Sequence, residues 1–209
     1  MRHIGKFFFM ADSTMGGMRA LLKDAKGVFI VPQEIKGAFI VGASGGSGVL
    51  VQRVGNTNDW SGPAFYTTGG ASFGLQIGGQ AAGIVLLIMS DRGIAAFMSN
   101  NFKLGADAGI AVGPVGLGAA TSTANLSADI ISFAKAKGLY GGISLDGAVV
   151  ATRDKWNHAY YRKSVTPIEI LGKDYKTAHS AGLLHAVAAA SQEKTKQMGE
   201  AGSAAQEMK

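Results

Sequence analysis

Glycine breaks this chain into short apolar runs. It supplies 31 of the 209 residues, about double its usual share. Hydrophobic residues make up 47% of the chain and charged residues 16%, a composition that can build a core and does not resemble that of a disordered protein. The longest apolar run, residues 83–89, is too short to cross a bilayer. We therefore expect one domain, followed by a tail.

Most of the apolar runs have the length and composition of strands. The candidates cover residues 28–31, 37–41, 49–54, 64–68, 71–77, 84–89, 102–115, 139–145 and 148–153. Residues 42–49 are interpreted as a turn or bulge, and Asp146-Gly147 predicts a two-residue hairpin turn between the last two candidates. Many short strands with few long helices argue against a doubly wound parallel sheet. The sequence predicts an α+β fold with a glycine-rich antiparallel β-sheet, curved or barrel-like, and peripheral helices.

Glycines also recur at intervals of four residues. The two series are Gly70, Gly74 and Gly78, and Gly105, Gly109 and Gly113. Residues four apart share one face of a strand, and glycine there permits tight bending and close approach of another backbone. The interval therefore supports a curved sheet.

The spacing of apolar residues predicts helices in a few segments. These are residues 14–25, 91–98, 155–161 and 176–196, with one more helix starting at Thr166-Pro167. Ser90 can cap the second of them. Residues 130–134 fit either a helix or a strand.

The first of these helices carries regularly spaced cations. Arg19, Lys23 and Lys26 are spaced i, i+4 and i+7, so they line one stripe of a helix over residues 14–25. Gly27 then ends the helix. The spacing predicts a cationic helix face close to the N-terminus.

The formal net charge of +6 is unevenly distributed. Residues 1–36 hold six basic and three acidic residues, and residues 91–163 hold eight basic and five acidic residues. Residues 37–90 contain only Arg53 and Asp59 as charged residues. The excess favours an anionic partner, which can be phospholipid, nucleic acid or an acidic protein face, or it serves only to solvate the surface.

One basic segment also contains aromatic residues. Its members are Arg153, Lys155, Trp156, Tyr160, Tyr161, Arg162 and Lys163. Nucleic-acid binding requires a denser patch than this, so we expect no nucleic-acid partner. A helix that packs its aromatics on the sheet is the favoured interpretation, and a membrane interface fits the same residue types.

No catalytic or metal-binding pattern stands out. Residues 42–49 lack the lysine of a nucleotide-binding loop, the chain has no cysteine, and its four histidines do not have metal-ligand spacing. Asp107 lies in an apolar stretch, where it is either a perturbed catalytic carboxylate or, more commonly, an acceptor for backbone N–H groups in a turn. We expect no enzyme activity and no cofactor.

Eight short motifs together identify a family. They lie at residues 25–28, 45–50, 60–64, 73–78, 102–107, 113–116, 135–140 and 166–171. In this order they resemble the SYLF family of lipid-binding domains, and the likeness covers about residues 15–172. The chain looks like the stand-alone bacterial type of that family.

The resemblance implies a non-enzymatic domain that binds phospholipid or phosphoinositide on anionic membranes. In eukaryotic members, an N-terminal amphipathic helix and nearby basic residues contact the membrane. By position, this role falls on Arg19, Lys23 and Lys26, with Lys6 and Phe8 as neighbours. Some eukaryotic members bind actin filaments, so the alternative is a protein-interaction module that binds actin or acts as a cell-envelope scaffold, with actin a partner only by family analogy.

The resemblance also suggests how the chain is organised. We expect an extension at residues 1–13, the SYLF-like domain at 14–175, and a C-terminal helix with a frayed tail at 176–209. Residues 7–10 either insert into lipid or pack on the protein's own sheet. Bacterial relatives of this type imply a periplasmic or cell-envelope location at the membrane periphery, in some cases as a lipoprotein.

Overall fold

Four long antiparallel strands form the centre of the structure. The computed structural model describes residues 16–38, 41–73, 78–113, 127–136, 139–142, 144–172 and 175–192. The long strands are β1 (Gly27–Ala38), β2 (Val41–Arg53), β3 (Trp60–Phe73) and β4 (Gly78–Ile88). They lie in the order β3-β2-β1-β4, so β1, β2 and β3 form two hairpins that share β2, and β4 pairs with the free side of β1.

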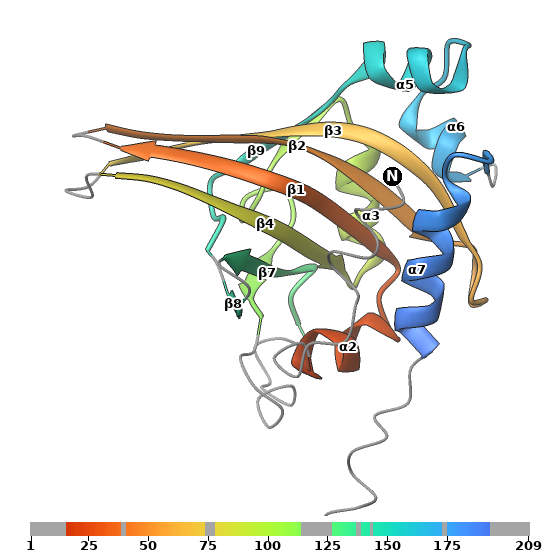
Figure 1. Ribbon diagram of the computed structural model, residues 1–209, viewed down its shortest axis with the longest axis horizontal. Helices are drawn as coiled ribbons and strands as arrows, with labels where there is room; N and C mark the ends of the chain where they lie inside the picture. The colour runs from red at the N-terminus through yellow and green to blue at the C-terminus, as the bar shows by residue number, and fades with distance from the viewer. Residues whose placement is uncertain are drawn as a thin grey trace, which may run out of the picture.

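Shorter strands extend the sheet on both sides. They are β5 (Asn101–Lys103), β6 (Ile110–Val112), β7 (Ile130–Ala136), β8 (Leu139–Gly142) and β9 (Val149–Thr152). The order is β5-β9-β3-β2-β1-β4-β7-β6, and β8 also pairs with β7. The described pairings are antiparallel except for β6 with β7. Figure 1 shows that the sheet is strongly curved, which confirms the predicted α+β class and curved antiparallel sheet.

The central strands are buried on both faces. In β1, Val28 and Ile30 belong to a core cluster that includes side chains of α2 (Gly16–Leu22) and α7 (Ala181–Gln192). Phe29 and Val31 point to the other face, where the core includes side chains of α3 (Asp91–Met98) and α6 (Pro167–Gly172). Because both faces are covered there, residues 28–31, 49–51 and 84–88 of these strands appear in the sequence as continuous apolar runs without polar alternation.

The long strands correct several sequence predictions. The predicted strands 28–31 and 37–41 are not separate elements, since residues 28–38 all belong to β1. Pro32 does not end β1, because the strand continues past a register shift of one residue, which lies between Ile30 and Glu34 in the pairing with β2 and between Val31 and Glu34 in the pairing with β4. A proline lacks the N–H that a regular ladder needs, and such a bulge accommodates it.

Glycine-rich segments likewise lie inside strands. The predicted turn or bulge at 42–49 belongs to β2, which pairs with β3 along this stretch. The strand β3 also joins the predicted strand 64–68 to residues 71–73 of the predicted strand 71–77. Residues 130–134, ambiguous in sequence, belong to β7. Residues 74–77 lie outside the described residues. Pairing on both sides therefore overrides the weak strand preference of glycine.

The Asp146-Gly147 turn forms, but it does not join a hairpin. Gly147 has φ of +80°, and the N–H of Ala148 donates to the carbonyl of Leu145 at 3.0 Å. The strand before the turn, β8, pairs with β7, whereas β9 pairs with β3 and β5. The residues of a turn determine where the chain reverses, but they do not determine which strands pair with each other.

The helices follow their capping signals. Ser90 caps α3 by accepting the N–H of Gly93 at 3.0 Å, as predicted. Thr166 and Glu169 form a reciprocal capping box at the start of α6. The helices α2, α5 (Asp154–Tyr161) and α7 lie within or close to the predicted segments, although α2 ends at Leu22 rather than residue 25.

Candidate functional site

The apolar face of α2 packs against the protein. Met18, Leu21 and Leu22 are buried in one cluster with Leu183 and Val187 of α7. Burying a large apolar side chain contributes about 1.5–3 kcal/mol, so undocking this helix is costly. In this structure α2 therefore presents its polar side, and not an apolar face, to the surroundings.

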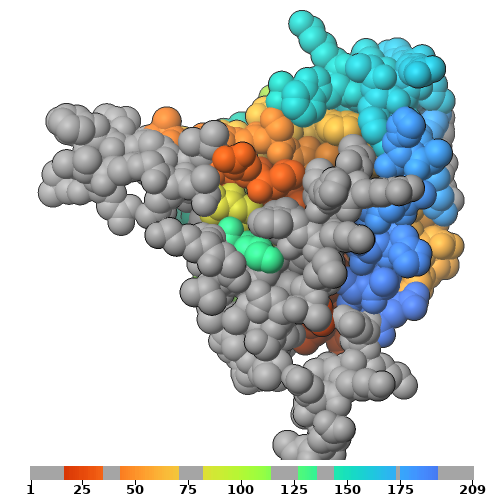
Figure 2. Space-filling view, viewed as in Figure 1, coloured from red at the N-terminus to blue at the C-terminus, as the bar shows by residue number. Residues whose placement is uncertain are grey.

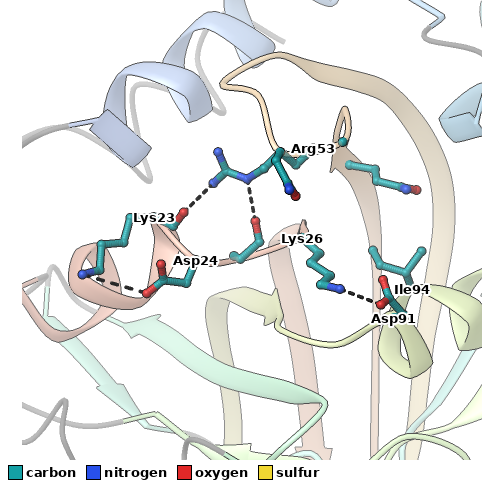
Figure 3. A pocket seen from close by; sticks show the side chains of 10 residues that line it. Lys23, Asp24, Lys26, Arg53, Asp91 and Ile94 are labelled. Atoms are coloured by element: carbon teal, nitrogen blue, oxygen red, sulfur yellow. Dashed lines mark hydrogen bonds and ion pairs between the residues drawn. The ribbon is translucent and has the colours of Figure 1, made fainter.

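Arg53 of β2 holds the C-terminal end of α2. Its Nε donates to the carbonyl of Ala25 at 2.9 Å, and its Nη2 donates to those of Leu22 and Lys23 at 3.0 and 3.1 Å. Its Nη1 reaches Thr57 and Asn58 in the β2–β3 connection, each at 3.2 Å. Figure 3 shows the guanidinium directed at the helix end.

This set of contacts uses the whole guanidinium group. A guanidinium has five N–H donors, and Arg53 makes five hydrogen bonds with the protein. The group also lies 4.5 Å from the ring centroid of Trp60. Partial burial lowers the pKa of Arg53, and the nearby Asp24 carboxylate opposes this shift. Arg53 is thus a structural clamp rather than a ready site for an incoming anion.

Two of the predicted site cations lie beside this clamp. Lys23 Nζ is 3.9 Å from an Asp24 carboxylate oxygen, and Lys26 Nζ is 2.6 Å from one of Asp91. Lys26 follows the end of α2, and its backbone N–H donates to the carbonyl of Ile88 at 2.8 Å. Helical geometry therefore does not continue the predicted stripe as far as Lys26.

An open cavity of about 410 Å³ brings these groups together. Lys23, Asp24, Lys26, Arg53 and Asp91 all contribute to its lining. Hereafter we call the two lysines and two carboxylates around this cavity the α2 rim. Arg19 is half-buried on α2 and does not line the cavity. Lys6 and Phe8 lie outside the described residues.

A second cationic surface surrounds α5. The guanidinium of Arg153 lies 3.6 Å from the ring centroid of Trp156, which is 45% exposed. Lys155, Arg162 and Lys163 are exposed as well. We call these five residues the α5 corner.

The aromatic residues of this segment divide between two roles. Tyr160 packs against Phe65 with ring centroids 5.1 Å apart, and the Tyr161 hydroxyl donates to the carbonyl of Pro63 at 3.0 Å. Burial raises the pKa of Tyr161 above its usual value, with Tyr160 and Tyr175 adding to the shift. The favoured sequence interpretation, aromatics packed on the sheet, therefore holds for the tyrosines, while Trp156 stays at the surface.

Asn157 fixes α5 to the sheet and was not singled out by its sequence context. Its side chain is fully buried, its Oδ1 accepts the N–H of Phe65 at 2.8 Å, and its Nδ2 donates to the Phe65 carbonyl at 3.4 Å. Both partners belong to one residue 92 positions away. The one available signal was an amide residue between aromatic residues on a short helix.

Sequence comparison identifies the family of this chain. A sequence model described as Ysc84, Las17-binding protein actin regulator, matches residues 69–190. The chain belongs to the Ysc84 family. This confirms the resemblance to SYLF domains that the eight motifs indicated.

Several curated relatives of this Ysc84-family chain contain SH3 domains according to their names. The human SH3 domain-containing YSC84-like protein 1 is 33% identical over 156 residues, which cover 74% of this chain and 45% of that protein. An SH3 domain-containing protein of Schizosaccharomyces pombe is 31% identical over 173 residues, covering 80% and 40% of the two chains. Protein YSC84 of Saccharomyces cerevisiae is 30% identical over 166 residues, covering 77% and 35%. The chain thus spans less than half the length of these relatives.

Two carboxylates of this Ysc84-family chain, Asp107 and Asp129, have structural partners. Asp107 is exposed and its Oδ2 accepts the N–H of Lys103 at 2.7 Å, as expected for a turn. Asp129 accepts hydrogen bonds from the Ser90 hydroxyl and from the N–H of Gly109. Burial opposes its ionisation, but these bonds and nearby Arg92 outweigh burial and lower the pKa of Asp129.

Metal-ligand clusters and membrane-spanning helices are both absent from the described part of this Ysc84-family chain. Within it, no group of three or more histidine, aspartate or glutamate side chains is arranged to hold a metal ion. None of its helices combines the length and apolarity needed to cross a membrane.

Proposed function

We propose that this Ysc84-family chain binds anionic phospholipid surfaces without catalysing a reaction, and that Lys23, Lys26 and Arg19 contribute to the contact. The observation that carries this proposal is the α2 rim, where Lys23 and Lys26 line one open cavity. Both lysines pair with carboxylates that are themselves exposed, since the side chains of Asp24 and Asp91 are 68% and 89% exposed.

Exposed ion pairs of this kind exchange easily. Such a pair contributes about 0–1 kcal/mol, because water and salt screen it. A lysine near an anionic bilayer contributes about 1 kcal/mol, so a phosphate can replace Asp91 beside Lys26 at little net cost. The expected attachment is weak, electrostatic and sensitive to salt.

The packing of α2 determines the mode of contact. Since Met18, Leu21 and Leu22 are in the core, lipid meets the polar rim of α2 rather than an inserted apolar face. Arg53 supports the rim by holding the last carbonyls of the helix, and Trp60 lies against its guanidinium.

Vesicle pelleting tests this proposal directly. The chain is mixed with vesicles of phosphatidylcholine alone or with phosphatidylserine, at low and at high salt. We expect binding to the mixed vesicles that falls as salt rises, and Lys23→Glu should weaken it about tenfold because the charge is reversed. Lys103→Glu is the matched control, since Lys103 is an exposed lysine of β5 that does not line the cavity.

Two results would count against the proposal. If the unmodified chain pellets with no anionic vesicle at low salt, phospholipid binding is wrong. If Lys23→Glu and Lys103→Glu bind equally well, the function stands but the α2 rim is not the contact.

A protein-interaction role is the second candidate. It is favoured by the family description, Las17-binding protein actin regulator, and by the YSC84 relative. In this case the chain binds actin or acts as a scaffold without any lipid. Co-sedimentation with actin filaments that persists at high salt and without vesicles would favour this role over phospholipid binding.

A further inference from the structure

The cations of the α5 corner differ from those of the α2 rim in that no carboxylate pairs with them among the described residues. Residues 153–163 include Arg153, Lys155, Arg162 and Lys163, with Asp154 as the single acidic residue of that segment. Across the described residues, no ion pair joins any of these four cations to a carboxylate. The segment therefore carries a net positive charge that the fold does not neutralise.

Trp156, the exposed tryptophan of the α5 corner, is held in a fixed orientation. Trp156 makes an edge contact with Phe65, with ring centroids 6.1 Å apart, and Arg153 covers its ring. Arg153 is itself fixed by a hydrogen bond to the hydroxyl of Ser47 at 2.5 Å. An indole that is already oriented loses little conformational entropy when it meets a partner.

The helix that carries this indole is also rigidly attached. Asn157 binds the N–H and carbonyl of Phe65, and the N–H of Arg153 donates to the same carbonyl at 2.9 Å. On the outer side of α5, Lys155, His158 and Ala159 are exposed. The sheet thus supports α5 from below and leaves its outer side to solvent.

The position of α5 suits a broad, flat partner. Figure 2 shows that the surface of α5 and its flanks stands out from one end of the molecule, and Figure 1 places α2 at the other end of α7. Extended peptides are bound along sheet edges or in grooves, whereas a protruding corner can meet a planar surface. Tryptophan beside lysine and arginine is typical of side chains at the depth of lipid headgroups.

We propose that the α5 corner is a second contact with anionic bilayers, with Trp156 at headgroup depth and Lys155, Arg162 and Lys163 against lipid phosphates. This inference rests on the proposed phospholipid binding and adds a separate surface to it. Two contacts at different places on the domain fix its orientation on the membrane, which the α2 rim alone does not do.

Tryptophan fluorescence tests the corner specifically. The sequence has two tryptophans, and Trp60 is 1% exposed, so a change on adding vesicles reports Trp156. We expect a blue shift with vesicles of phosphatidylcholine and phosphatidylserine, and quenching by lipids brominated near the headgroup. Trp156→Phe should abolish both signals while leaving the fold intact, as judged by circular dichroism.

Charge reversal gives an independent measurement. Lys155→Glu should weaken pelleting with the same vesicles about tenfold at low salt, whereas Lys103→Glu serves as the matched exposed control. Trp156→Ala should weaken binding by a similar factor at low and at high salt, since its contribution is apolar, whereas the effect of Lys155→Glu should shrink as salt rises.

The outcomes separate the two proposals. If the chain pellets with anionic vesicles but Trp156 shows no shift and Lys155→Glu binds like Lys103→Glu, the α5 corner is wrong and phospholipid binding stands. If no anionic vesicle is bound, both are wrong. A blue shift with single-stranded RNA or an acidic peptide, and none with vesicles, would overturn the corner as a bilayer contact.

Discussion

The α2 rim with the neighbouring Arg53, and the α5 corner, both contain lysine and arginine and use them differently. Beside the rim, Arg53 donates all its N–H groups to the protein, and within the rim Lys26 pairs with Asp91. At the corner, Arg153 covers the ring of Trp156, while Lys155 remains exposed. The difference shows that the number of cations in a segment does not give its available charge. Counting the partners of each N–H group does.

The largest expected effect concerns the clamp at the rim. Arg53→Ala should lower the free energy of unfolding by about 2–4 kcal/mol, because the carbonyls of Leu22, Lys23 and Ala25 lose their donor. Urea denaturation followed by circular dichroism measures this change.

Arg53→Lys is the matched variant for that experiment. A lysine keeps the charge but has its donors on one atom, so it cannot span the helix end and the β2–β3 connection together. We expect Arg53→Lys to retain less than half of the free energy of unfolding that Arg53→Ala loses. Full recovery by lysine would show that charge, and not the fork of donors, holds α2.

A smaller effect is expected at the support of the corner. Asn157→Ala should lower the free energy of unfolding by about 1–3 kcal/mol, since it leaves the partly buried N–H and carbonyl of Phe65 without the side chain that binds them. The environment of Trp156 should change too, which native-state fluorescence detects.

His158→Ala is the control on the same helix. His158 is exposed, so its replacement should change stability by less than about 0.5 kcal/mol. Equal effects of the two substitutions would mean that α5 is not held by Asn157.

The sequence predicted helix starts and caps better than it predicted which strands pair and where they end. The cap at Ser90 and the start at Thr166-Pro167 depend on neighbours within three residues, and both are confirmed. Strand limits were wrong where glycine resembles a turn, as at residues 42–49, because pairing on both sides decides the outcome there.

The two surfaces also differed in how far the sequence predicted them. The cations of the α5 corner are close together in the sequence, so they were recognised as one group. Arg53 was noted only as an isolated charge, because its carbonyl partners Leu22 and Ala25 lie 31 and 28 residues away. Asn157 and Phe65 are further apart still, at 92 residues. Contacts over such distances leave no periodic trace in one sequence.

The smallest expected effect is the one that best separates the two surfaces. Asp91 and Asp154 each lie in the first turn of a helix, and replacing either by asparagine adds one positive charge to its surface. Asp91→Asn also frees Lys26, so it should strengthen vesicle binding about fivefold at low salt, although it removes a favourable charge from the start of α3.

A double-mutant cycle makes this comparison specific. If lipid contacts the α2 rim through Lys26, the gain from Asp91→Asn should be clearly smaller when Lys26→Gln is also present, because the freed lysine is then missing and only the change in net charge remains. The gain from Asp154→Asn should not depend on Lys26, since it arises at the α5 corner. Equal gains from Asp91→Asn with and without Lys26 would show that the rim contributes only its net charge. The ion pair at 2.6 Å would then have no part in controlling the contact.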